Sequence, residues 1–217
     1  ITISVEDGEA LARKTWNARL GIMGGLSILG TTGVVVPYSC SAWIHSIHRG
    51  IDVARAADLL HIAASTGSTS EKSVAALYQL PLMALIDMGD FVGGTLKYLR
   101  QHPVERLTIA GGFAKLSKLA AGHMDLHSKR SQVDPGFLAQ LAEQAGAPPD
   151  ITSAMVASGS AGAVLQIAEK EGIAIGDSVA AAARAESLKM AEGAFDVEII
   201  AYDRRGQMVG RAGFASA

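Results

Sequence analysis

The sequence contains a single cysteine, Cys40, among 217 residues. One cysteine excludes an internal disulfide and is typical of a reducing compartment, so we expect a cytoplasmic protein. No histidine motif accompanies Cys40, which favours the role of a small buried apolar residue over that of a nucleophile.

An excess of basic residues is also missing. Lysine and arginine number 19 against 21 aspartates and glutamates, which gives a formal net charge of −2. Proteins that bind nucleic acids normally carry a basic surplus, so we expect no nucleic-acid partner. Hydrophobic residues make up 49% and charged residues 18% of the chain. This composition is typical of a globular protein. A chain of this length can form one well-buried domain, or one domain and part of another.

Long runs of large apolar side chains are absent as well. The uncharged stretches 20–44 and 151–168 are rich in Gly, Ser, Thr or Ala, and the first contains Pro37. Neither has the continuous apolar character that a bilayer requires, so we expect no membrane partner. No basic region precedes an apolar core at the N-terminus, so no signal peptide is predicted. The chain starts with Ile1 instead of Met, which is compatible with a longer natural protein.

From residue 38 onward the hydrophobic pattern alternates between helix and strand periods. Helices are predicted at 39–58, 71–79, 94–100, 113–121, 135–144, 151–169 and 176–191. Short apolar runs at 59–64, 82–90 and 106–112 separate the first helices, which implies a parallel sheet covered on both faces. The segments 195–203 and 207–213 predict a terminal hairpin. The predicted fold class is therefore α/β, with a Rossmann-like mostly parallel sheet, helices on both faces and a C-terminal antiparallel hairpin.

The segment 17–37 holds five glycines and two adjacent threonines between short apolar runs. Glycine lets a ligand approach the main chain, and free N–H groups beside threonine hydroxyls can cradle polar or anionic groups. Gly30, Thr31, Thr32 and Gly33 are therefore predicted to bind a ligand. The alternative is a strand, turn and strand with ordinary turn glycines.

Three of the predicted strands end in glycine-containing turns, at 66–71, 87–94 and 110–118. Because the carboxyl ends of parallel strands form one crevice, these turns are expected to surround a single pocket. The candidate ligand-binding residues in the three turns are Gly67, Glu71, Gly89, Asp90 and Gly111. The alternative for Glu71 and Asp90 is that they only help to begin helices. Neither G-x-G-x-x-G nor G-x-x-x-x-G-K-[ST] occurs, which argues against ordinary NAD and ATP sites.

Basic residues gather after the third turn, and Arg19 lies in the glycine-rich segment. The predicted contacts to a polyanionic ligand are Arg19, Lys115, Lys118, His123 and His127. The alternative is a set of solvated surface charges. His123 and His127 have the spacing of metal ligands on a helix, but 123–134 reads as a loop with no glutamate between the two. No metal site is predicted.

Five segments, in this order, resemble one known family: NARLGIMGGLSILGTTGVVVPYS, GIDVARA, TGSTSE, MGDFVGG and GGFAKLSKLAAGHMDLHS. They look like the cobalt-precorrin-5B C1-methyltransferases, the CbiD family of anaerobic cobalamin biosynthesis. The resemblance implies transfer of a methyl group from S-adenosylmethionine to C1 of a cobalt-containing corrin precursor, giving cobalt-precorrin-6A. It further implies that S-adenosylmethionine contacts the glycine-bearing turns and that the cobalt-corrinoid contacts the basic set. The substrate carbon is then the nucleophile, so no protein nucleophile is expected.

The sequence departs from the family pattern at its start. Family members begin with a further N-terminal region that carries a G-Y-T-T-G type motif, and this motif is missing here. We therefore expect residues 1–36 to be a glycine-rich connector with strands from the end of a first domain, and residues 37–217 to form the Rossmann-like domain. Two alternative functions stay open: a non-catalytic tetrapyrrole or nucleotide binding module, and an atypical nicotinamide-dependent oxidoreductase. The sequence assigns no catalytic acid or base and leaves a homo-oligomer open.

Overall fold

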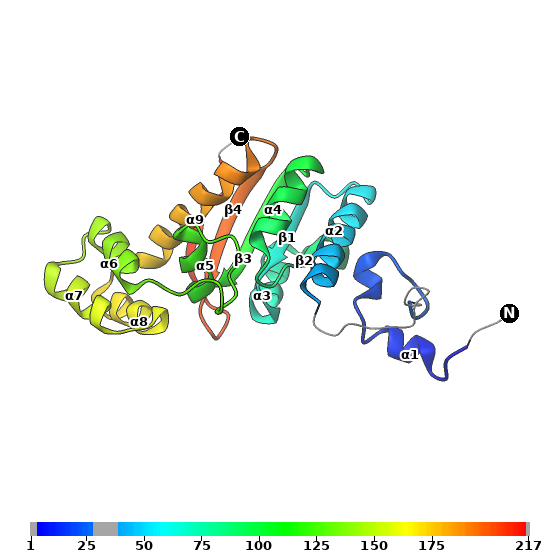
Figure 1. Ribbon diagram of the computed structural model, residues 1–217, viewed down its shortest axis with the longest axis horizontal. Helices are drawn as coiled ribbons and strands as arrows, with labels where there is room; N and C mark the ends of the chain where they lie inside the picture. The colour runs from blue at the N-terminus through cyan, green and yellow to red at the C-terminus, as the bar shows by residue number, and fades with distance from the viewer. Residues whose placement is uncertain (1–3, 28–38, 216–217) are drawn as a thin grey trace.

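The computed structural model describes residues 4–27 and 39–215 (Figure 1). The helices are α1 (Gly8–Ala12), η1 (Asn17–Leu20), α2 (Cys40–Ala56), α3 (Ser68–Tyr78), η2 (Leu82–Ala84), α4 (Val92–Gln101), α5 (Phe113–Ala120), α6 (Pro135–Gln144), α7 (Pro149–Ala157), α8 (Ala161–Glu171) and α9 (Ile175–Ala191). The strands are β1 (His61–Ser65), β2 (Leu85–Asp87), β3 (Arg106–Gly112), β4 (Asp196–Tyr202) and β5 (Met208–Ala212). The predicted ligand residues Gly30, Thr31, Thr32 and Gly33 lie outside the described ranges.

The strands form one five-stranded sheet in the order β2-β1-β3-β4-β5. Strand β1 pairs in parallel with β2 and β3, β3 pairs in parallel with β4, and β5 runs antiparallel to β4. The chain steps from β1 to β2 and then crosses to β3 on the other side of β1. The strand order therefore reverses at β1, which places the topological switch point between β1 and β3. The predicted α/β class, with its mostly parallel sheet and terminal hairpin, is confirmed.

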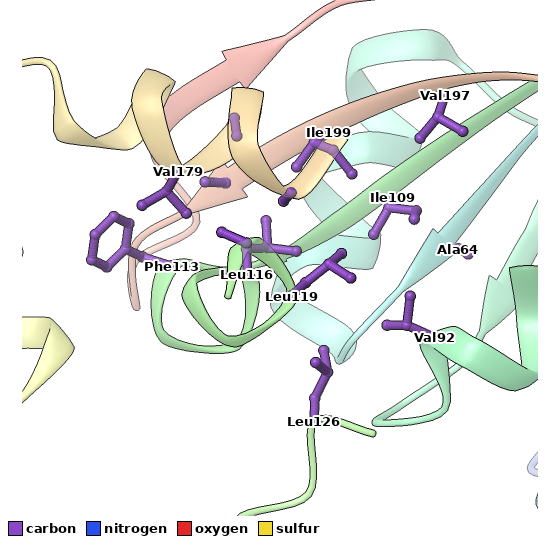
Figure 2. Close-up of a cluster of buried hydrophobic side chains, with 14 of the residues drawn as sticks. Ala64, Val92, Ile109, Phe113, Leu116, Leu119, Leu126, Val179, Val197 and Ile199 are labelled. Atoms are coloured by element: carbon purple, nitrogen blue, oxygen red, sulfur yellow. The ribbon is translucent and has the colours of Figure 1, made fainter. Parts of the chain in front are cut away.

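Helices cover both faces of the sheet. Side chains of α2, α4, α5 and α9 pack with one set of alternating strand residues in the larger core. Figure 2 shows part of this core, with Ile109 of β3 beside Leu119 of α5 and Val197 of β4 farther along the sheet. The other alternating set faces α3, where Val74 packs with Ala63, Ala110 and Ile200. This alternation follows from the period of two along a strand. Burying one Leu or Ile side chain fully stabilises the fold by about 1.5–3 kcal/mol.

Two local predictions were wrong. The helix predicted at 151–169 is divided into α7 and α8, because Gly159 adopts a φ of 70° and the Ser160 side chain accepts a hydrogen bond from the Ala163 N–H, at 3.2 Å, to begin α8. Cys40 is exposed, not buried, because it is the first residue of α2 after the capping Ser39.

One pair of glycines sets how closely α9 packs against β5. A Cβ atom on Gly176 would lie 1.7 Å from the Val209 carbonyl oxygen, and one on Gly210 would lie 2.0 Å from the Gly176 carbonyl carbon. Both positions therefore require glycine so that the two backbones can touch. This contact joins α9 to the antiparallel edge of the sheet.

The N-terminal segment 4–27 lies at one end of the molecule, opposite α6, α7 and α8 (Figure 1). It contains α1 and η1, and none of its described residues forms a strand. The rings of Trp16 and Trp43, the latter in α2, pack in a T-shaped arrangement with their centroids 5.4 Å apart. The predicted boundary at residue 36 falls in the range that is not described and stays a prediction. Within the described ranges, every helix is too short or too polar to cross a membrane.

Candidate functional site

A cavity of about 910 Å³ opens at the carboxyl ends of β1, β3 and β4. Its volume lies in the range of pockets that hold small molecules, about 300–1,000 Å³. The lining residues come from the β1–α3 turn, the β3–α5 turn, α8 and the β4–β5 turn, and they include Gly67, Gly112, Lys115, Ser160, Glu169 and Arg204. The position beside the switch point is where open α/β sheets bind their ligands.

Three helices begin at this cavity. Gly67 precedes α3, Gly112 precedes α5 and Ser160 precedes α8, and all three residues line the cavity. No side chain caps α3 or α5, and a Cβ atom on Gly67 or Gly112 would meet no atom of the described chain within 4 Å. The first backbone N–H groups of these two helices are thus available to a ligand, and each helix start carries a partial positive charge.

Lys115 forms one boundary of the cavity. Its ammonium nitrogen donates to the Thr66 carbonyl oxygen at 3.0 Å and lies 2.9 Å from Asp90 Oδ1. The predicted residue Gly111 packs against the same β1–α3 turn, because a Cβ atom there would lie 3.0 Å from the Thr66 side chain. The structure therefore brings Asp90 and Lys115 together, whereas Gly111 serves the packing of the two turns against each other.

Beyond Lys115, toward the end of β2, lie three carboxylates that we call the acidic cluster: Glu71, Asp87 and Asp90. Glu71 accepts two hydrogen bonds from Arg19, of 2.6 and 2.7 Å. Burial raises the pKa of Asp87 and the Glu71 carboxylate adds to this rise, while Arg19 opposes it. The structure thus pairs two residues that we predicted for different ligands, Arg19 and Glu71, with each other.

Gly89 shapes the backbone beside the acidic cluster. Its φ is 55°, and a Cβ atom there would lie 3.3 Å from the Trp43 ring. The Trp43 indole N–H donates to the Asp87 carbonyl oxygen at 3.0 Å, so the ring is fixed against this turn. Trp43 is 38% exposed and leaves an aromatic surface beside the cluster.

The remaining basic candidates lie on or under the loop 121–134. Lys118 is only 7% exposed and donates to the Leu126 carbonyl oxygen at 3.0 Å. His123 and His127 are exposed, and His127 Nδ1 accepts from the Lys129 N–H at 3.2 Å. Among the described residues, no group of three or more His, Cys, Asp or Glu side chains could hold a metal ion.

Sequence reasoning missed several residues of the site. Asp203, Arg204 and Arg205 line the cavity because β4 runs parallel to β3 and ends at the same edge of the sheet. The sequence predicted the strand 195–203 that ends at this charged turn, but not that this strand lies parallel to β3. Asp87 was also missed as a ligand candidate, although it follows Gly67 at the separation at which an acidic residue commonly binds a ribose, about 20 residues.

Comparisons with known proteins identify relatives of this chain. The family model described as "CbiD" matches residues 1–37, and the model described as "CbiD, C-terminal domain" matches residues 125–213. Relatives from Brucella canis and Brucella suis, named cobalt-precorrin-5B C(1)-methyltransferase, are 61% identical to this chain over 212 residues. The aligned region covers 97% of this chain and 58% of each relative, so the chain spans little more than half of their length.

A crystal structure of a cobalamin biosynthesis protein (cbiD) from Archaeoglobus fulgidus is 25% identical, covering 78% of this chain and 42% of that one. Its TM-score of 0.26 is too low to support a structural argument. The two family models together match more than half of this chain, and the high identity to the Brucella relatives extends over nearly all of it. The chain belongs to the CbiD family.

Proposed function

We propose that this chain carries out, as part of a CbiD protein, the transfer of a methyl group from S-adenosylmethionine to C1 of cobalt-precorrin-5B, giving cobalt-precorrin-6A. The observation that carries the proposal is the 61% identity, over 212 residues, to relatives that are named for methylation at this carbon. The cavity at the switch point supports it, since open α/β sheets bind their ligands at this position.

The residues at the carboxyl edge of the sheet fit S-adenosylmethionine. Asp87 and Asp90 offer acceptors for ribose hydroxyls or for an ammonium group, and the β1–α3 turn at Gly67 leaves open space beside the main chain. When bound, S-adenosylmethionine supplies an electrophilic methyl group. The predicted contacts at Glu71, Gly89 and Gly111 remain part of this proposal, with Glu71 acting through its ion pair with Arg19.

The part of this chain in catalysis is to hold two ligands in line. The corrin carbon attacks the methyl group, so the protein supplies binding and orientation and no nucleophile. Lys115 is held by Thr66 and Asp90 at the cavity wall, where it can orient a carboxylate of the corrinoid. We keep Lys118, His123, His127 and Arg19 as proposed corrinoid contacts. For Lys118, this requires its ammonium group to leave the Leu126 carbonyl oxygen.

Binding of the separate ligands tests this proposal. S-adenosylmethionine, NADH and a cobalt corrinoid are added in turn and thermal unfolding is followed. A ligand that binds only the folded state stabilises it by about 2.7 kcal/mol at a hundredfold excess over its Kd. We expect a response to S-adenosylmethionine and to the corrinoid. A response to the corrinoid alone would favour the binding module, and a response to NADH alone would favour the oxidoreductase.

We place the protein in the cytoplasm because its single cysteine suits a reducing compartment. Its small partner is the cobalt-corrinoid substrate, with the cobalt ion carried by that substrate.

A further inference from the structure

The cavity carries a positive electrostatic bias. The starts of α3, α5 and α8 all line it, and each helix start is equivalent to roughly half a positive charge. The charged side chains of its lining are three cations, Lys115, Arg204 and Arg205, and two carboxylates, Glu169 and Asp203, and Lys115 is paired with Asp90 outside the lining. Asp203 pairs with Arg205, at 3.0 Å, so the turn itself leaves Arg204 as its net charge.

Among the described residues, two side chains of the lining have a polar group without an ion-pair or hydrogen-bond partner. Arg204 is exposed and forms no ion pair with any residue in the described ranges. Tyr202 is 3% exposed, and its hydroxyl has no hydrogen-bond partner within the same part of the chain. A buried hydroxyl without a partner is costly, and such groups in native proteins commonly mark a ligand or a water site. Burial raises the pKa of Tyr202 to about 12, so the phenol stays a hydrogen-bond donor.

The surface on the other side of Lys115, around the acidic cluster, has a negative electrostatic bias. The acidic cluster holds three carboxylates, of which Glu71 is neutralised by Arg19 and Asp90 by Lys115. Asp87 has no ion-pair partner of its own among the described residues. Trp43 exposes an aromatic ring against the same turn, which suits a planar base or a cation. Lys115 thus separates a cationic cavity from an acidic and aromatic surface along one edge of the sheet.

We infer that the cavity holds the side-chain carboxylates of the corrin substrate, with Arg204 as a contact, and that the adenosyl ligand lies on the opposite side of Lys115, over Asp87. This inference rests on the proposed function and adds the placement of the two ligands. S-adenosylmethionine bears a sulfonium and an ammonium against one carboxylate and is a net cation, whereas the corrin precursor is a polyanion. Opposite charges attract and like charges repel, so exchanging the two ligands would replace a favourable electrostatic interaction with an unfavourable one on each side of Lys115.

A paired set of substitutions tests this placement. Arg204→Gln and Asp87→Asn each remove one charge, and both variants are titrated with S-adenosylmethionine and with a cobalt corrinoid that has free carboxylates. Arg204→Gln is expected to weaken corrinoid binding by about threefold to tenfold and to leave S-adenosylmethionine binding unchanged. Asp87→Asn is expected to give the reverse pattern. The same corrinoid with its carboxylates converted to methyl esters is expected to bind both proteins, wild type and Arg204→Gln, equally.

Matched controls remove the same charges elsewhere. The controls are Lys72→Gln and Glu105→Gln. Lys72 lies on the exposed surface of α3 outside the cavity, and Glu105 lies just before β3, at the amino ends of the parallel strands. Neither control is expected to change either affinity, and far-UV circular dichroism checks that all variants are folded. The placement is overturned if Arg204→Gln weakens S-adenosylmethionine binding, or if the two variants weaken the same ligand. If the unsubstituted chain binds neither ligand, the proposed function itself fails and the placement fails with it.

Discussion

Arg19 and Glu71 form a bidentate ion pair between η1 and α3, with N–O distances of 2.6 and 2.7 Å. Both side chains are mostly buried, at 22% and 14% exposed. A paired guanidinium and carboxylate in this geometry gives charge-assisted hydrogen bonds with fixed direction. The pair therefore connects the N-terminal segment to the edge of the sheet that holds the candidate site.

Replacing Glu71 by Gln tests this connection. The amide keeps the shape of the side chain but loses the charge, so we expect the docking of η1 to weaken by about 1–2 kcal/mol. Hydrogen exchange of the η1 amides should become faster, while exchange in β3 should stay unchanged. Glu186→Gln, which breaks an exposed ion pair with Lys189, is the control and should affect neither. Unchanged protection of η1 in Glu71→Gln would contradict the role of this pair.

Removing the hydroxyl of either of two tyrosines on the α3 face of the sheet is expected to change the free energy of unfolding differently. Tyr78 donates to the buried Glu198 at 2.5 Å and accepts from Arg211 at 2.8 Å, whereas the Tyr202 hydroxyl has no partner within the described residues. Tyr78→Phe should lower the free energy of unfolding by about 1.5–3 kcal/mol, because a hydrogen bond to a buried carboxylate is lost. Tyr202→Phe should leave it unchanged or raise it slightly.

Urea unfolding of both variants measures these changes, and binding measurements complete the comparison. Tyr202→Phe should weaken corrinoid binding if the phenol contacts this ligand in the cavity, while Tyr78→Phe should not. A loss of stability in Tyr202→Phe as large as that in Tyr78→Phe would show that the Tyr202 hydroxyl has a structural partner.

The free energy of unfolding is expected to fall as the pH is lowered, because His61 becomes protonated more readily in the unfolded chain. Burial lowers the pKa of His61, Arg106 adds to this effect and Glu198 opposes it. The pKa in the folded protein is thus below the unfolded value of about 6.5, so protons bind the unfolded state more readily. The contribution of His61 is fully present above pH ~6.5 and is lost as the pH falls through the folded pKa, with a slope of at most about 1.4 kcal/mol per pH unit.

Comparing the wild type with His61→Gln isolates this effect, because the other titrating groups are shared. His61 Nε2 lies 2.8 Å from Thr108 Oγ1, and a glutamine amide can donate to the same hydroxyl. Urea unfolding at pH 7.5 and pH 5.0 should show a smaller pH dependence in the variant. Equal dependence in both proteins would mean that His61 does not titrate differently on folding.

The sequence predicted those elements whose signals are local. Strand β3 coincides with the predicted 106–112 because a continuous apolar run ends at two glycines, and α6 coincides with 135–144 because Asp134 caps a helix whose first residue is Pro135. The pairing of Arg19 with Glu71 could not be predicted, since it joins residues 52 positions apart. The lining of the cavity by α8 and by Arg204 depends on the strand order, which no local pattern contains.

The most direct test of the proposed function follows the methyl group itself. The chain is incubated with cobalt-precorrin-5B and S-adenosylmethionine labelled with ¹³C in its methyl group, and the corrin product is analysed by mass spectrometry and NMR. The account predicts one labelled methyl group at C1 for each S-adenosylhomocysteine formed. A labelled methyl at another carbon, or no labelled corrin although both ligands bind, would contradict it.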